Sequence, residues 1–340
     1  MGLNIPRDLA AWQARERRRH PARQLARRLK RPAPAPVWVA RNRPDPQVAV
    51  LLEQRTGPVR AALVDPLRHL PEIGAMVVAP FDLNGTVPAT WSVSQHSEIH
   101  LGRDFIAGRV ILATSHASTL AQDVYQQAIN RGIEFWVVQA RILNPYAPPL
   151  PEGGRLLAWS DSDAEFWASG RSDIQTTVVG SQLLWLAQQQ RVPYLSEGNR
   201  PLYLGQTSAS GLSRAGLARA AITFCHTTHG AYRPHPDETD HVSKLEHATF
   251  EGLGIDVDRA AQPLDQIARP VTSACSTGLL EAAARGLPAF VWYPRPPAWL
   301  HDLWQRYGLR PWGGEPTPAP ILPTAQPAHT VAHIIRERCV

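Results

Sequence analysis

Short apolar runs recur along this chain and alternate with helical segments, and this alternation limits the available folds more than any other feature. The first series lies at 37–40, 48–52, 61–64, 75–80, 109–115, 134–139, 155–159 and 176–181, and the second at 201–206, 230–236, 254–258, 270–274 and 288–293. Buried parallel strands read as continuous apolar runs, and strands alternate with helices in doubly wound sheets. We therefore predict an α/β protein with two Rossmann-like, doubly wound domains that face a cleft.

The length of 340 residues agrees with two domains, since a single core rarely grows beyond about 250–300 residues. We predict a basic N-terminal helix with a proline-rich linker at 1–36, an N-terminal Rossmann-like domain at 37–190, a C-terminal Rossmann-like domain at 191–322 and a closing helix at 323–340. Helices between the strands are expected at 117–131, 211–226, 238–252 and 276–285, and the closing helix at 328–338.

The positive charge of the chain is concentrated at its start. The formal net charge is +6, but residues 1–32 hold ten Arg or Lys against two acids, which leaves about −2 for the remainder. This segment is either a solvated extension, a helix packed on its own domain, or a peripheral contact with an anionic membrane through residues 7–31. A nucleic-acid partner is not expected, because the rest of the chain lacks a basic pattern interleaved with aromatic residues.

The cysteines and the hydropathy pattern favour a cytoplasmic protein. Cys225, Cys275 and Cys339 are odd in number and show no CxxC spacing, so neither a disulfide framework nor a zinc knuckle is predicted. No apolar run approaches the length of a membrane span, and we expect no secretory signal, because the first residues lack an apolar core. Membrane association at the inner face, through the basic segment, stays open.

The stretch YRPHPDETD, at 232–240, places charged side chains directly after a predicted strand. The carboxyl ends of strands are where open α/β sheets bind ligands. Arg233 offers a planar fork for a phosphate or carboxylate, and His235 is held between two prolines that fix φ on each side. The alternative is an ordinary turn with Asp237 as a helix N-cap and no ligand.

A second polar cluster follows the strand predicted at 270–274, in the stretch SACSTGLLEAAARG. The hydroxyls of Ser273, Ser276 and Thr277 accompany the free N–H groups of a helix start, which is a natural site for an anion. Glu281, further along this helix, could reach a ribose hydroxyl. Helix capping alone would also explain Ser276.

Together these two stretches resemble the C-terminal domain of GT-B glycosyltransferases. The resemblance is greatest to bacterial capsule and lipooligosaccharide sialyltransferases and polysialyltransferases, which have a His-Pro motif and a Ser/Thr-rich motif. The segments 155–171 and 178–185 also look like the interdomain part of nucleotide-sugar transferases. The resemblance covers roughly residues 110–300.

The resemblance implies that the C-terminal domain holds a nucleotide donor. His235, Ser276 and Thr277 match the positions that contact the donor phosphate, and Gln206 matches a strand-end position that touches the nucleotide. The nucleotide sugar is then a substrate, and no further cofactor or metal is implied. The stretch CHTTH at 225–229 has the look of a metal site, but Cys225 and His226 are adjacent on a predicted helix and point apart.

The same resemblance assigns the acceptor and the catalytic base to the N-terminal domain, where the match is poorer. A base must reach the acceptor hydroxyl, and His, Asp or Glu are the usual types. We rank His116 first and Glu98 second, with Ser115 and Gln139 on the acceptor side. Similar transferases commonly read Gln-His-Gly where Ala140 follows Gln139 here. Either the base lies elsewhere or this copy is altered or inactive.

The sequence therefore predicts an enzyme that moves a sugar from a nucleotide donor to a hydroxyl of a bacterial surface glycan. The resemblance favours an inverting, metal-independent transfer and, weakly over a UDP-sugar, a sialic-acid-like donor on CMP. Two alternatives stay open. One is a non-catalytic protein that binds a nucleotide sugar or glycan, which the missing His at 140 suggests, and the other is a UDP-sugar epimerase on the same scaffold.

Overall fold

The computed structural model describes residues 5, 8–19, 36–191, 200–206, 211–259 and 266–339. Of the basic N-terminal segment it describes mainly helix α1 (Leu9–Arg19), so much of the predicted membrane contact through 7–31 lies outside the described residues. No helix in the described part of the chain combines the length and the apolar character needed to cross a bilayer.

The chain divides into two compact units, and it passes between them more than once. Unit 1 contains Ile142–Tyr146 and Leu183–Leu322, and unit 2 contains Asn4–Arg141, Ala147–Gln182 and Pro323–Val340. The division therefore falls near the predicted boundary at 190, while the segment predicted as a separate closing helix packs within unit 2.

Unit 2 is built on an eight-stranded sheet. Its strands, in spatial order, are β4 (Ser92–His96), β1 (Val37–Arg41), β3 (Ala75–Ala79), β2 (Val48–Leu51), β5 (Val110–Ala113), β6 (Glu134–Val138), β7 (Arg155–Ala158) and β8 (Gln175–Val178). From β3 to β8 neighbouring strands are parallel, whereas β1 runs antiparallel to both β3 and β4. The central strands β2, β3 and β5 are buried at every position, as expected for strands covered on both faces.

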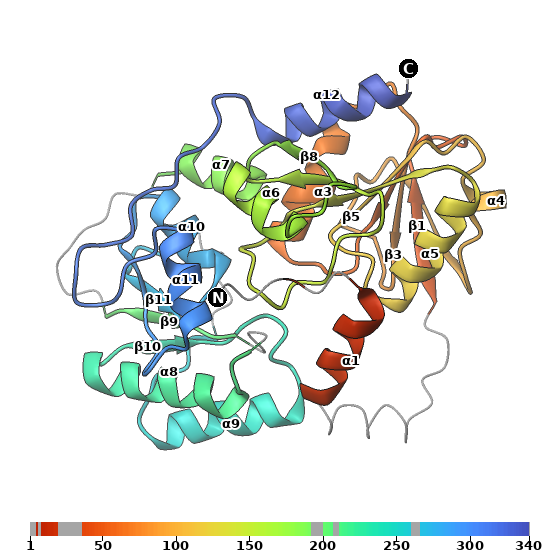
Figure 1. Cartoon of the computed structure of the whole chain (residues 1–340). Helices are drawn as coiled ribbons and strands as arrows, with labels where there is room; N and C mark the ends of the chain where they lie inside the picture. The colour runs from red at the N-terminus through yellow and green to blue at the C-terminus, as the bar shows by residue number, and fades with distance from the viewer. Residues whose placement is uncertain are drawn as a thin grey trace. The chain divides into compact units, whose positions relative to one another are not determined.

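Helices cover both faces of this sheet. One face carries α3 (Gly57–Leu63), the 3-10 helix η1 (Asp65–His69) and α12 (Pro327–Cys339), of which α12 comes from the far end of the chain (Figure 1). All three contribute side chains to one apolar core. Trp136 of β6 points into that core, while its neighbour Phe135 points the other way and meets Tyr125, with 5.3 Å between ring centroids. Tyr125 belongs to α5 (Thr119–Asn130), so α5 covers the opposite face.

Two elements of unit 2 differ from the predicted ones. The run 61–64 was predicted as a strand, but it lies in and directly after α3. Pro58 at the start of the helix sets a helical φ, and Val59, Leu63 and Val64 pack into one core. Strand β4 was not predicted, since its sequence SVSQH is polar and the strand is largely exposed at the sheet edge. The remaining elements of the unit are α4 (Leu101–Asp104) and α6 (Asp161–Ala168), and α7 (Gln182–Gln189) begins where the chain passes into unit 1.

Unit 1 contains a four-stranded parallel sheet in the order β10 (Ala231–Arg233), β9 (Leu202–Leu204), β11 (Val271–Ser273) and β12 (Ala289–Val291). Its helices are α8 (Arg214–Thr228), α9 (His241–Gly252), α10 (Thr277–Ala284) and α11 (Ala298–Arg306). Tyr203 and Tyr232 point from the sheet into a core with Phe224 of α8 and Phe250 of α9. The predicted strand at 254–258 forms only an isolated bridge between Val257 and Tyr232.

Each sheet contains a point where the order of its strands reverses. In unit 2, β2 leads through α3 to β3 on one side, and β5 lies on its other side; in unit 1, β9 leads through α8 to β10, and β11 lies on its other side. Right-handed crossovers place the two helices that follow these neighbouring strands on opposite faces of the sheet. Ligands of open α/β sheets bind at the carboxyl ends of the two strands between which the order reverses. The predicted α/β class, with a doubly wound arrangement in two units, is confirmed.

We expect Leu112→Ala to lower the free energy of unfolding by about 2–5 kcal/mol, because Leu112 is fully buried in the core of unit 2 and its truncation leaves a cavity. Urea denaturation followed by circular dichroism measures the change. The matched control is Ile106→Ala, whose side chain is 72% exposed and whose loss should cost no more than about 0.5 kcal/mol. Equal effects of the two substitutions would contradict the placement of β5 at the centre of the sheet.

Candidate functional site

Gln206 links the two strand ends at the reversal point of the unit 1 sheet. It follows β9, and its Oε1 accepts hydrogen bonds from the backbone N–H of Cys275, at 3.2 Å, and from Ser273 Oγ, at 3.3 Å. Ser273 is fully buried, and its hydroxyl also lies 3.0 Å from the carbonyl oxygen of Leu204. Ser273 therefore shapes the turn after β11 from inside, and Gln206 fixes that turn from the neighbouring strand.

The first residues of α10 provide hydroxyl groups next to this turn. Ser276 is the N-cap, and its Oγ accepts a hydrogen bond from the N–H of Gly278 at 3.1 Å. Thr277 Oγ1 accepts one from the N–H of Ile142 at 3.2 Å. Because each hydroxyl accepts from a backbone N–H, its own proton is left to be donated. With the positive end of the helix dipole, this arrangement suits an anion.

His235 lies in the loop after β10, at the same carboxyl edge of the sheet. Its Nδ1 accepts a hydrogen bond from the backbone N–H of Asp237 at 3.2 Å, so the neutral ring carries its proton on Nε2 and can donate it. The side chain is partly exposed, at 29%. Strand β9 lies between β10 and β11, so the ends of β10 and β11 are about 9–10 Å apart.

Arg233 and Glu281 belong to a charged group inside unit 1. Burial lowers the pKa of Arg233, and the charges of Asp258, Arg269 and Glu281 also act on it. The Glu281 carboxylate pairs with Arg285 of the same helix at 3.2 Å, and both side chains are almost fully buried. Contact of Glu281 with a ribose hydroxyl stays a prediction, and it would compete with this ion pair.

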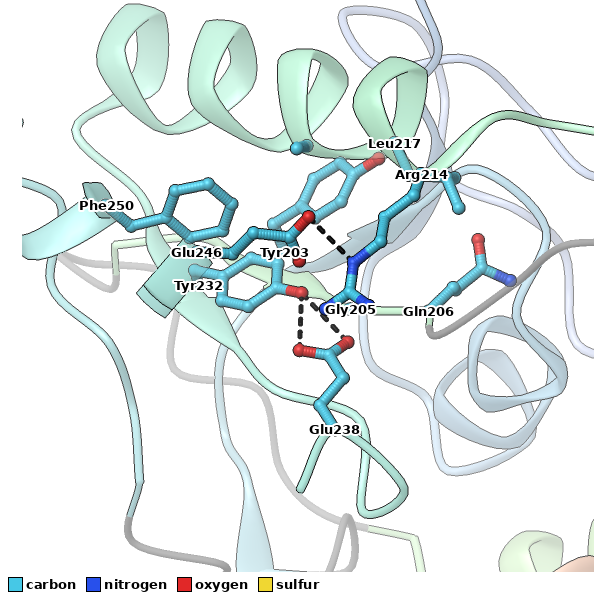
Figure 2. Close-up of a pocket in the computed structure, with 10 residues that line it drawn as sticks. Tyr203, Gly205, Gln206, Arg214, Leu217, Tyr232, Glu238, Glu246 and Phe250 are labelled. Carbon is cyan, nitrogen blue, oxygen red and sulfur yellow. Dashed lines mark hydrogen bonds and ion pairs between the residues drawn. The ribbon is translucent and has the colours of Figure 1, made fainter. Parts of the chain in front are cut away.

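A small pocket that is partly open to solvent lies beside Gln206. Its wall carries Arg214 and Glu246, joined by a hydrogen bond of 2.8 Å, and Tyr232, whose hydroxyl donates to Glu238 at 3.0 Å (Figure 2). Glu238 also pairs with His247 at 2.7 Å. These residues come from β10, α8 and α9 and the loop before α9, so only the tertiary structure shows that they meet.

The helix start after YRPHP was predicted incorrectly. The N-cap of α9 is Asp240, whose carboxylate accepts the N–H of Ser243 at 2.8 Å, and Asp237 stays in the preceding loop. Glu238, predicted in the first turn of the helix, is instead buried as the partner of Tyr232 and His247. A sequence offers no means of choosing among several acids in a row, because each can cap a helix.

The carboxyl edge of the unit 2 sheet contains a carboxylate that sequence reasoning missed. Glu53 follows β2, is half-buried, and accepts a hydrogen bond from Ser118 Oγ. Ser118 is the N-cap of α5, where its Oγ accepts the N–H of Ala121 at 3.0 Å. Burial raises the pKa of Glu53, and the Ser118 hydrogen bond opposes that rise. The signal was present, since Glu53 is the first acid after the apolar run 48–52.

The loop after β6 contacts the same edge. Arg141 donates hydrogen bonds to Gln54 and, at 3.0 Å, to Thr56 Oγ1, which joins the loops that follow β6 and β2. Gln139 is 2% exposed and is hydrogen-bonded on both sides of its amide, to the backbone N–H of Trp159 and to Asp163. Ala140, at the position where similar transferases commonly have a His, is buried in the unit 2 core.

The structure does not bring the two predicted bases together. His116 lies just before α5, and Glu98 precedes Ile99, whose carbonyl oxygen accepts a hydrogen bond from Gln127 in the last turns of α5. The helical rise between Thr119 and Gln127 is about 12 Å. Glu98 is exposed and hydrogen-bonded to His100 at 2.7 Å.

His116 is 5% exposed, its ring lies against Tyr125, and its Nδ1 has no hydrogen-bond partner within the described ranges. Burial, with a smaller contribution from the charge of Arg171, lowers the pKa of His116 to about 4. Its neighbour Ser115 is half-buried, and its Oγ accepts the N–H of Ala117 at 3.4 Å.

The stretch CHTTH does not form a cluster. Cys225 is buried in the unit 1 core, where burial raises the pKa of its thiol to about 12, and His226 is exposed on α8. Across the described residues, no three His, Cys, Asp or Glu side chains are grouped so as to hold a metal ion.

Comparison with known proteins gives only distant likenesses. No protein-family model matches the sequence, and no curated protein matches it. Among solved structures, a glycosyltransferase from Rickettsia africae ESF-5 matches 87% of this chain and 88% of its own, with 10% identity and a TM-score of 0.46. Anabaena Alr3699/HepE in complex with UDP matches 86% of this chain and 89% of its own, with 13% identity and a TM-score of 0.39.

A second structure of Alr3699/HepE, with UDP and glucose, matches 86% of this chain and 95% of its own, with 13% identity and a TM-score of 0.41. All three TM-scores are below 0.5, so these likenesses do not establish the family.

We expect the stability of the protein to fall by up to about 3 kcal/mol between pH 6.5 and pH 4 through His116 alone. Its folded-state pKa of about 4 lies below the ordinary value of 6.5, so the unfolded chain binds more protons in this window. His116→Gln should remove this part of the pH dependence, and His226→Gln, at an exposed position, should keep it. Urea midpoints measured across the window test this, and identical pH slopes for wild type and His116→Gln would contradict it.

Proposed function

We propose that the protein is a glycosyltransferase that moves a sugar from a nucleotide donor to a hydroxyl group. One observation carries this proposal. The predicted phosphate-binding residues Gln206, His235, Ser276 and Thr277 all lie at the carboxyl edge of one parallel sheet, around the strand pair where its order reverses. This is the position at which open α/β sheets bind nucleotides.

The chemistry of the reaction explains why hydrogen-bond donors are useful at this position. As the acceptor oxygen attacks the anomeric carbon, the bond from that carbon to the phosphate oxygen breaks and negative charge grows on the leaving phosphate. The protons of Ser276, Thr277 and His235 Nε2, together with the amino end of α10, can stabilise this charge by hydrogen bonding. The proposal is a single displacement with inversion at the anomeric carbon.

The finer assignment concerns the donor and the acceptor. We favour a sialic-acid-like sugar carried on CMP, because the His-Pro and Ser/Thr-rich stretches resemble those of sialyltransferases, and a UDP-sugar is the second choice. The acceptor proposed is a hydroxyl of a bacterial surface glycan, bound at the carboxyl edge of unit 2 near Ser115. Contact of the basic N-terminal segment with an anionic membrane belongs to the same proposal.

The alternative of a non-catalytic binder stays open, because Ala140 stands where similar transferases commonly have a His, and Ala140 is buried in the core of unit 2. Slow release of free sugar from a nucleotide sugar would separate a transferase from a binder, since a binder leaves its ligand intact.

We expect His235→Ala to raise the Kd for the preferred nucleotide, CMP or UDP, by about 10–100-fold. This is the effect of losing a hydrogen bond to a charged phosphate, worth roughly 1.5–3 kcal/mol. Isothermal titration calorimetry gives the Kd, and the melting temperature shows whether the fold survives. His241→Ala, at an exposed histidine at the start of α9, is the control and should bind as the wild type does.

Two results would overturn the proposed function. In one, neither CMP nor UDP binds the wild-type protein or raises its melting temperature. In the other, His235→Ala and His241→Ala bind the nucleotide equally well, which would mean that the imidazole after β10 takes no part in binding.

A further inference from the structure

The reversal point of the unit 2 sheet holds two titratable groups, Glu53 after β2 and His116 after β5. The strands β2 and β5 are direct neighbours, and α3 and α5, which follow them, cover opposite faces. Their carboxyl ends therefore form the position at which a sheet of this kind receives a ligand. A sugar hydroxyl that is to react must lose a proton, so the question is which group can accept it.

We propose that Glu53 accepts the proton of the acceptor hydroxyl, with Ser118 as the residue that positions its carboxylate. This inference rests on the sugar transfer proposed above and adds a residue that the sequence comparison with sialyltransferases did not indicate. Three features of the site support it: the partial exposure of Glu53, the effect of burial on each group, and the network that holds the loop.

The side chains of His116 and Glu53 differ in their exposure to solvent. The His116 side chain is buried among its neighbours, with Tyr125 across its ring, so a substrate hydroxyl has no access to it in this conformation. Glu53 is only half-buried, and it is followed by the exposed residues Gln54 and Arg55. A general base must come within hydrogen-bond distance of the proton that it takes.

Burial has opposite effects on the two groups. Accepting a proton neutralises Glu53. Burial disfavours the charged carboxylate relative to the neutral acid, and the pKa of Glu53 is therefore raised. Accepting a proton charges His116 in a buried place beside Arg171, and its pKa is lowered to about 4. The same desolvation that makes Glu53 a better base makes His116 a poorer one.

The loop that carries Glu53 is held on two sides. Ser118 Oγ donates to its carboxylate and, by accepting the N–H of Ala121, is itself fixed as the cap of α5. Arg141 donates to Gln54 and Thr56, the residues that follow. The carboxylate is therefore positioned by contacts with the loops after β5 and β6, as a proton acceptor requires.

Other carboxylates of unit 2 suit the role less well. Asp163 is 2% exposed and accepts a hydrogen bond from Gln139. Burial also raises the pKa of Asp65, but this residue follows α3, at the opposite edge of the sheet, and its charge interacts with Arg68. Asp82 lies after β3, and its Oδ1 accepts from the backbone and side chain of Asn84.

The proposed step transfers one proton to Glu53 and one sugar to the acceptor oxygen. The O–H bond of the acceptor breaks and its proton passes to a Glu53 carboxylate oxygen, while the acceptor oxygen forms the new bond to the anomeric carbon. The bond from that carbon to the donor phosphate breaks, and its electron pair leaves with the nucleotide. Water can replace the acceptor in the same step, which gives free sugar and provides an assay before the natural acceptor is identified.

The test compares Glu53→Gln with Glu165→Gln, a change at an exposed acid on α6. CMP-sialic acid and UDP-glucose serve as the two donors, and release of free CMP or UDP is followed together with the Kd for each nucleotide. Glu53→Gln should slow release about 10²–10⁴-fold, the usual contribution of a general base, and leave the Kd unchanged. Glu165→Gln should match the wild type in both.

A pH profile separates proton transfer from a merely structural role. Wild-type release should decline on the acid side as Glu53 becomes protonated, at a pH above the ordinary carboxyl value of 4.5. Ser118→Ala removes the hydrogen bond that lowers this pKa, so the decline should move to higher pH. Among the described residues, the other titratable or charged groups on this and the surrounding loops include Arg55, Asp82, His116 and Arg141. Because His116 is buried and is not the proposed base, His116→Gln should keep the wild-type profile.

The results that would overturn the role of Glu53 differ from those that would overturn the proposed function. Failure of both nucleotides to bind overturns the function itself. If a nucleotide binds, the assignment of Glu53 is overturned by release at the wild-type rate in Glu53→Gln, by an acid limb that persists in that variant, or by the absence of any release from the wild type. A variant that is as stable as the wild type at pH 7 but slow in release supports the assignment.

Discussion

The right-handed connection between parallel strands is the constraint on which the rest of this structure depends. Wherever strand order reverses, as beside β2 and β9, it sends successive helices to opposite faces of the sheet. Because the two helices diverge to opposite faces, they leave a space between the loops that follow the two strands, at the carboxyl edge of the sheet. His235 follows the edge strand β10; the other side chains that we assign to ligand binding or proton transfer lie on such a loop or at the helix start that follows it.

A similar device fixes the loops in both units. In unit 1 the amide oxygen of Gln206 accepts the backbone N–H of Cys275, and in unit 2 the amide oxygen of Gln139 accepts that of Trp159, at 2.8 Å. In each case a glutamine just after one strand holds the loop after a neighbouring strand. An amide suits this role because it can donate and accept at once without carrying charge. Preorganised loops then present their polar groups with little further ordering when a ligand binds.

The sequence indicated the fold well where burial is complete and poorly where it is partial. Continuous apolar runs identified the central strands, but AALV at 61–64 was equally apolar and lies in a helix that begins just before it, with Pro58 in its first turn. Strand β4 escaped notice because a polar, exposed edge strand leaves no apolar pattern. The pattern of apolar residues indicates which side chains are buried. It does not indicate whether the residues before them start a helix or a strand.

The site was foreseen in part, for a related reason. The polar residues after β10 and β11 were found because they directly follow apolar runs, and the structure places them on one edge of one sheet. Glu53 and the pocket lined by Tyr232 and Arg214 were missed, because their environments depend on contacts between distant segments. The pKa of a carboxyl or imidazole is set by such contacts, so sequence alone ranked His116 above a better-placed acid.

The position of α12 has a consequence for how the protein is made. Val331, Ala332 and Ile335 of this helix complete the core of unit 2, although most of unit 1 intervenes in the chain. During translation, α3 and η1 can cover part of this face, but the remainder stays exposed until unit 1 and then α12 have left the ribosome. Unit 2 therefore completes its core only after the chain of unit 1 has been made.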